Sequence, residues 1–432
     1  MKKVKLDLVA WTVGLYVLLP MFFRIGPVSA YSLVILAVCG FTMLWQKIRI
    51  PAYALTNVGW DARFLLIMIP MVHHNEYTAI ILYLIAPVLL YLLLIHDIRS
   101  EDRLNRILDV LIWCSAINAL VCFVEVLTGF NLSYALCNDG TAAYEPLYRY
   151  GILRVYGCFV NPINNGVYAM MMSAVVLYRI YSGKLLRQKR LVLWVIWFAN
   201  LAVVILTSSR AAMLTAAVVN VLLLWQAGAF RLSARFLIFF TTALAAVVLL
   251  LLIPNPLTEQ LQEMLLSVLQ VLDDMFGTGF VESSGTDEIV EGVGNRLELY
   301  DWVRESVGSD TLFGKGRAAK FEYVMNQFGH TKKSIENQYL SEYFRYGMVG
   351  LCSKIFLFAT LLISKFLGMV RERKAGVKLG FSSVLFAVLL AYFLCLFTVA
   401  QNQEEKLFYL LVVLGEIYTR SRFYLKKKEV QP

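Results

Sequence analysis

Charged residues are scarce in this chain. They make up 16% of its 432 residues, whereas soluble globular proteins average about 25%. Hydrophobic residues make up 59%, and the mean hydropathy is +0.65. The apolar residues gather in blocks long enough to cross a bilayer core of about 30 Å. This composition predicts a polytopic membrane protein. It excludes a secreted enzyme, a nucleic-acid-binding protein and a cytosolic metabolic enzyme as descriptions of the whole chain.

Motifs for metal and nucleotide binding are also missing. The seven cysteines include no CxxC and no spacing that suits metal ligation. Gly314 and Gly316 lack the third glycine and the preceding strand of a nucleotide-binding fingerprint, and no HExxH occurs. We therefore expect no metal ion and no cofactor.

The apolar blocks predict an all-α fold, a bundle of about twelve transmembrane helices with a large helical extracytoplasmic loop. More than half of the 40 Lys and Arg residues fall in short loops and tails that lie inside if the N-terminus is cytoplasmic. Cytoplasmic loops are rich in these residues, so both termini are expected in the cytoplasm. The same residues account for most of the net charge of +10. The predicted spans run near residues 6–23, 29–46, 53–72, 77–95, 107–129, 161–181, 191–208, 211–228, 236–254, 346–365, 379–400 and 404–421.

Two outside segments are long enough to carry function. One lies near residues 130–160 and the other covers residues 255–335; long structured loops are usually functional. We expect a first bundle of about nine spans over residues 1–254, and about three further spans with a basic tail over residues 336–432. The outer face of a bacterial-type membrane lacks nucleotide donors, so an enzyme acting there is expected to use lipid-activated substrates.

Charged side chains at membrane depth are costly and usually functional. Arg210 follows three hydroxyl residues in a tight turn between two apolar blocks, where a fixed guanidinium could bind a diphosphate. The alternative is an interfacial arginine that only reaches lipid headgroups. A second polar group, residues 334–347, comes just before an apolar span and includes Glu336, Asn337 and Arg345. It could also be no more than the polar start of that helix.

A third element is a predicted helix in the large loop that carries Arg296 and Arg304. Taken alone, that pair is typical of a solvated face. Together, the three elements resemble the O-antigen polymerase/ligase superfamily of bacterial polysaccharide assembly. The features that resemble the family are the turn at residues 207–213, the arginine-led helix with the turn at residues 312–316, the Asn337 segment with Gly347 and Gly350, and the asparagine-proline segment at residues 159–166.

This resemblance implies the function and the donor, an undecaprenyl-diphosphate-linked oligosaccharide at the outer face of the cytoplasmic membrane. The predicted reaction transfers this glycan to another lipid-linked oligosaccharide and so lengthens an O-antigen, capsule or exopolysaccharide. The ligase branch has a histidine where this chain has Glu336, which favours a polymerase. The alternatives are a ligase that uses a terminal acceptor, and a flippase or exporter of lipid-linked sugars. A flippase and a chain-length regulator are expected partners, together with the lipid bilayer and without nucleic acid.

The site residues follow from these elements. The leaving group is already a diphosphate, so it needs cations rather than a proton. Arg210 and Arg296 are expected to stabilise it, and Glu336 to act as the base for the acceptor hydroxyl. His330 is the competing base, and Glu336 could instead pair with Arg345 or Lys333 and only orient the helix. The expected substrate-binding residues are Ser209, Arg304, Asn337, Arg345 and Asn161.

Overall fold

The computed structural model is mostly helical. It describes residues 7–20, 23–25, 28–45, 58–77, 80, 90–136, 144–149, 151–182, 186–228, 298–324, 331–400 and 405–421. Three of its helices are long and apolar enough to cross a membrane: α5 (Glu101–Thr128), α8 (Arg187–Leu206) and α13 (Gln338–Lys374). Three shorter helices are also apolar: α1 (Leu8–Leu18), α9 (Arg210–Gln226) and α14 (Phe381–Cys395). These helices confirm the predicted class, a mostly helical chain with candidate membrane spans.

The remaining long helices fall where the apolar blocks predict them. They are α2 (Ala30–Trp45), α3 (Val58–His73), α7 (Pro162–Ser182) and α15 (Glu405–Ser421). The predicted span near residues 236–254 lies outside the described residues, as does most of the span near 77–95. The count of twelve spans therefore stays a prediction, and so does the size of the large loop.

The helix α7 lies at the centre of the bundle. It packs against α5, α8, α9 and α14, and nearly all of its side chains are buried. A helix surrounded on every side has to be apolar all round. Other helices turn large apolar side chains outward, for example Leu120 of α5 at 63% exposed and Val195 of α8 at 61%. Such surfaces suit contact with lipid tails.

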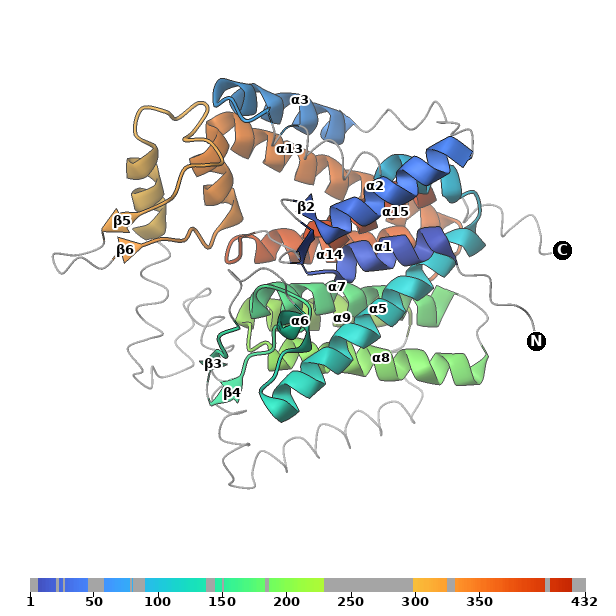
Figure 1. Cartoon of the computed structure of the whole chain (residues 1–432). Helices are drawn as coiled ribbons and strands as arrows, with labels where there is room; N and C mark the ends of the chain where they lie inside the picture. The colour runs from blue at the N-terminus through green and yellow to red at the C-terminus, as the bar shows by residue number, and fades with distance from the viewer. Residues whose placement is uncertain are drawn as a thin grey trace.

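The strands are short hairpins that connect helices. They pair in antiparallel fashion as β1 (Arg24–Ile25) with β2 (Val28–Ser29), β3 (Tyr148–Arg149) with β4 (Ile152–Leu153), and β5 (Tyr323–Val324) with β6 (Thr331–Lys332). The second and third hairpins and the short helix α6 (Leu132–Ala135) lie toward the same side of the bundle (Figure 1). We call this side the loop end. It is where α5 and α8 end and where α9 and α13 begin.

The helix α13 is interrupted near its start. At Gly347 the backbone angles are φ 62° and ψ −158°, a conformation that is essentially restricted to glycine. The break divides α13 into two unequal parts. Residues 338–346, about two turns, are called the first half, and residues 348–374, which cross the bundle, are called the second half. A helix of residues 298–307 packs its Leu299, Trp302 and Val303 against Leu340 and Phe344 of the first half.

Candidate functional site at the loop end

The turn between α8 and α9 is deeply buried. Thr207, Ser208 and Ser209 are at most 4% exposed. Thr207 is in the right-handed helical region, and Ser208 has φ 48°, which is costly for a residue with a side chain. Consecutive right- and left-handed residues form a concave backbone nest that favours anions.

The same turn starts the helix α9. Ser209 is its N-cap residue but makes no capping hydrogen bond with its side chain, and Arg210 is the first helical residue. The N-terminus of a helix carries positive partial charge and favours an anion. Both predicted residues, Ser209 and Arg210, therefore lie at the N-terminus of a helix, and their contact with a diphosphate stays a prediction.

Two further arginines reach this turn from the loop between α6 and α7. The Nε atom of Arg154 donates a hydrogen bond to the carbonyl of Thr207 at 2.9 Å, and Nη1 of Arg149 donates to the carbonyl of Ser208 at 3.3 Å. Two arginines of this loop thus bind the buried turn that comes directly before Arg210. Arg149 and Arg154 were not predicted as site residues from the sequence. Their position could have identified them, because both lie in a predicted outside loop, where lysine and arginine are usually scarce.

The loop that carries these arginines is held by a carboxylate. Glu125 of α5 is fully buried and accepts hydrogen bonds from the backbone N–H of Tyr156 at 3.1 Å and of Gly157 at 2.8 Å. The hydroxyl of Tyr144 donates to the same carboxylate at 3.0 Å. Tyr156 lies within the protein, and its burial raises the pKa of the hydroxyl above the usual value. The loop is therefore fixed to the bundle.

The predicted residue Asn161 lies at the start of α7, at the same end. It is exposed, and its side-chain oxygen accepts a hydrogen bond from the backbone N–H of Ile163 at 2.8 Å. Its buried neighbour Asn165 donates to the carbonyl of Val155 and accepts from Asn118 at 2.8 Å. In the structure Asn161 caps a helix, and its predicted contact with substrate stays a prediction.

The first half of α13 is joined to α9 through the end of α14. The N–H of Gln338 donates to the carbonyl of Leu396 at 2.9 Å, and the hydroxyl of Tyr339 donates to the carbonyl of Phe393 at 3.0 Å. In the same stretch of α14, Sγ of Cys395 lies 3.2 Å from Oγ1 of Thr215 in α9. The end of α14 therefore contacts both helices that begin with predicted site residues.

Asn337 has a local structural role as the N-cap of α13. Its side-chain oxygen accepts hydrogen bonds from the N–H groups of Tyr339 at 2.9 Å and Leu340 at 3.1 Å. Such a cap typically contributes about 1 kcal/mol. This explains locally why an asparagine stands at the start of the polar helix.

Glu336 differs from its predicted surroundings. Its side chain is 47% exposed. It pairs with Lys332 at 2.9 Å rather than with Lys333 or Arg345. The reason is that Glu336 precedes the helix and is still part of the segment that follows β6. Arg345 and Arg304 are exposed, while Arg296 and His330 lie outside the described residues.

The turn at residues 311–316 is inserted into the break in α13. The N–H groups of Lys315 and Gly316 donate to the carbonyls of Phe344 and Arg345, both at 2.8 Å. In return, the N–H groups of Met348 and Val349 donate to Thr311 and Leu312 at 2.9 and 3.3 Å. The two motifs that the sequence analysis recognised separately therefore bind each other through their backbones.

The end of α3 supports this turn from the other side. His74 Nε2 lies 3.2 Å from the carbonyl oxygen of Phe313, and the carboxylate of Glu76 accepts a hydrogen bond from the N–H of Arg317. Within the turn, the side chain of Lys315 bonds the exposed carboxylate of Asp310 and lowers its pKa below the usual value.

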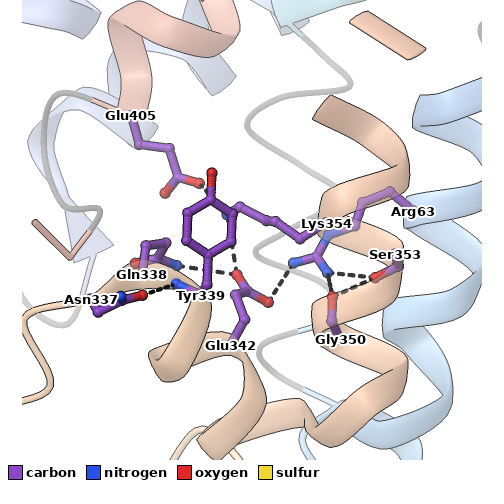
Figure 2. Close-up of polar contacts among 9 residues, drawn as sticks. All are labelled: Arg63, Asn337, Gln338, Tyr339, Glu342, Gly350, Ser353, Lys354 and Glu405. Atoms are coloured by element: carbon purple, nitrogen blue, oxygen red, sulfur yellow. Dashed lines mark hydrogen bonds and ion pairs between the residues drawn. The ribbon is translucent and has the colours of Figure 1, made fainter. Parts of the chain in front are cut away.

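A buried cluster of charges spans the break in α13 (Figure 2). Arg63 of α3, Glu342 of the first half and Lys354 of the second half have side chains no more than 7% exposed. Nη2 of Arg63 and Nζ of Lys354 lie 2.7 and 3.1 Å from the two carboxylate oxygens of Glu342. No role was predicted for these three residues from the sequence. Arg63 and Lys354 are charges inside the predicted spans 53–72 and 346–365, whereas Glu342 belongs to the polar group of residues 334–347.

Among the residues that the structure describes, no group of three or more His, Cys, Asp or Glu side chains is placed to hold a metal ion. The metal-independent reaction stays a prediction.

A comparison with protein families matches residues 193–355 to the family described as O-Antigen ligase. This match confirms the resemblance to the O-antigen polymerase/ligase superfamily that the motifs indicate. Members of that family are glycosyltransferase-like enzymes that act on lipid-linked oligosaccharides in a membrane. The matched segment includes the α9 turn and the break in α13, whereas Arg63, Arg149 and Arg154 precede it. No curated protein matches the chain.

Proposed function

We propose that this chain, as a relative of the O-antigen ligases, transfers a lipid-diphosphate-linked oligosaccharide to a second lipid-linked oligosaccharide and so lengthens a surface polysaccharide. The observation that carries the proposal is that Arg149 and Arg154 bind the buried turn at the start of α9, directly before Arg210. Guanidinium groups remain protonated and bind phosphate oxygens in a bidentate manner. The donor is an undecaprenyl diphosphate carrying the glycan.

In this proposal the loop end faces the outer side of the cytoplasmic membrane and both termini are cytoplasmic. Residues 1–254 and 336–432 form the membrane bundle, and residues 255–335 cover the site from outside. Arg296 and Arg304 close over the donor from this covering segment. Ser209, Asn161 and Arg345 contact the diphosphate and its first sugars.

The diphosphate leaves as the new glycosidic bond forms, so negative charge develops on it during transfer. The α9 turn stabilises that charge through the helix N-terminus and the arginines. The acceptor hydroxyl loses its proton to a base, which we assign to Glu336 next to Asn337. The pair of Glu336 with Lys332 is an exposed one, and such pairs are worth about 1 kcal/mol or less. An incoming sugar hydroxyl can therefore displace Lys332.

We predict that Glu336→Gln slows the chemical step on the order of 10²-fold, since general-base catalysis contributes that much. The amide keeps the shape of the side chain and removes the proton acceptor. Donor binding should remain near wild type. The measurement is single-turnover transfer and donor affinity with purified protein, and Lys332→Gln is the control that removes the ion pair but keeps the base. Weak donor binding together with an unchanged single-turnover rate in Glu336→Gln would show that Glu336 only positions the site.

The family is described as O-Antigen ligase, but the match does not distinguish a polymerase from a ligase. We favour the polymerase because the ligase branch has a histidine at the position of Glu336. A reconstituted assay with one lipid-linked oligosaccharide as both donor and acceptor separates the possibilities. A polymerase produces a ladder of lengthened lipid-linked products and releases undecaprenyl diphosphate. Transfer that occurs only after a terminal acceptor is added would identify a ligase, and movement of intact lipid across the membrane without transfer would identify a flippase.

A further inference from the structure

The break in α13 leaves the first half of the helix without a continuous helical connection to the bundle. At Gly347 the usual helical ladder is interrupted, and the turn at residues 311–316 takes up the freed backbone groups. Backbone hydrogen bonds satisfy the break, but a single glycine joint does not by itself fix the angle between the two halves. Further contacts are required to set that angle.

Arg63 makes contacts of this kind on both sides of the break. Its Nη2 atom binds Glu342 of the first half at 2.7 Å. Its Nη1 atom binds the carbonyl of Gly350 at 2.7 Å and Oγ of Ser353 at 2.6 Å, both in the second half. The planar, rigid guanidinium thus holds three groups in fixed directions, and it does so from a third helix, α3 (Figure 2).

Lys354 makes a second connection across the break. Its Nζ atom lies 3.1 Å from the other oxygen of Glu342 and 3.9 Å from Glu405 of α15. Gln338, one turn before Glu342, also donates to this carboxylate at 3.2 Å. The carboxylate of Glu342 therefore ties the first half to α3 and to the second half of α13, and Lys354 also contacts α15.

Burial makes these connections strongly dependent on one another. Removing one partner from a buried ion cluster leaves an uncompensated charge and is costly, whereas replacing the whole cluster by apolar side chains is often neutral for stability. Buried clusters of this kind are thus better explained by specifying a geometry than by adding stability, and here the geometry is the direction of the first half.

We propose that Arg63, Glu342 and Lys354 are positioning residues, which fix the angle of the first half of α13 and thereby hold Glu336 and Asn337 at the loop end. The helix of residues 298–307 packs on Leu340 and Phe344 of that half. The cluster therefore also supports the surface on which that helix packs. Its effect on transfer rests on the proposed function, whereas its effect on the geometry of the break does not.

The test replaces the whole cluster in the full-length protein, as Arg63→Met, Glu342→Leu and Lys354→Met together. The matched control is Lys365→Met with Glu416→Leu, because that pair also joins α13 to α15, is 0% and 8% exposed, and lies in the second half, away from the break. Both variants lose a buried ionic contact, but only the first should alter the angle at Gly347. Arg63→Lys is a third variant, which keeps the charge but loses the planar fork.

The first readout is hydrogen exchange, which needs no enzymatic activity. The amides of residues 315, 316, 348 and 349 should exchange at least 10-fold faster in the triple variant than in wild type, and at the wild-type rate in the control. The second readout is single-turnover transfer, which should fall 10-fold or more in the triple variant with donor affinity unchanged, because small misplacements cost large factors in rate. In Arg63→Lys, both the amide exchange rate and the transfer rate should lie between those of wild type and the triple variant.

The inference would be overturned if these four amides exchanged at the wild-type rate in the triple variant. It would also be overturned if their exchange became equally fast in the control. Wild-type transfer despite faster exchange would overturn it too. If the wild-type protein transfers no glycan at all, the proposed function fails, and the exchange readout still decides whether the cluster holds the break.

Discussion

Replacing Arg210 with lysine should reduce transfer nearly as much as replacing it with alanine, on the order of 10²-fold, the cost typical of losing one preorganised donor to developing charge. Arg210 begins α9 directly after a buried turn, so its backbone is fixed relative to Arg149 and Arg154. A lysine at this position supplies a point charge but cannot form two parallel hydrogen bonds to a phosphate. The measurement is polymer length in cells and donor affinity in purified protein at matched protein levels.

The control is Arg187→Lys, since Arg187 is an exposed arginine at the other end of the preceding helix α8. It should leave transfer and donor affinity unchanged. Near-wild-type polymer in both Arg210→Lys and Arg210→Ala would mean that Arg210 only contacts lipid headgroups.

Gly347→Ala should break the backbone hydrogen bonds between α13 and the turn at residues 311–316. A Cβ atom at this position would lie 2.3 Å from the carbonyl oxygen of Leu312, and backbone atoms cannot move aside as a flexible side chain does. The backbone conformation is in addition essentially restricted to glycine. We expect the rate of transfer to fall on the order of 10²-fold or more, the cost typical of misplaced catalytic groups. The amides of the turn should exchange hydrogen faster.

Gly376 provides the matched control for this substitution. It also has a positive φ, 80°, but a Cβ there would meet nothing within 4 Å. Gly376→Ala should therefore cost only the backbone strain of about 1–2 kcal/mol and leave transfer intact. Equal loss of transfer in the two variants would show that strain, and not the contact with Leu312, explains the effect of Gly347→Ala.

The helices were predictable because their signal is local. Blocks of apolar residues predict α5, α8 and α14 without knowledge of their neighbours. The hydroxyl turn before Arg210 was predictable for the same reason, since a few polar residues between two apolar blocks have to form a short connection.

The contacts of the site were not predictable, because they join residues far apart in the chain. Nothing local to Arg63 indicates that it binds Glu342, 279 positions later. The ion pair of Glu336 with Lys332 was likewise not predicted, because Glu336 lies before the helix, in the segment that follows β6. The charges inside the spans could have identified Arg63 and Lys354 as residues of interest, but not their common partner.

The most direct test of the account is the position of a bound donor. An experimental structure of the full-length protein with undecaprenyl diphosphate would show where the diphosphate lies. The diphosphate should lie at the loop end, within hydrogen-bonding distance of Arg210 and the first N–H groups of α9, with Arg149 and Arg154 beside it. A diphosphate bound at the opposite end, for example in the cavity lined by Glu101, Tyr178, Lys378 and Tyr418, would contradict it.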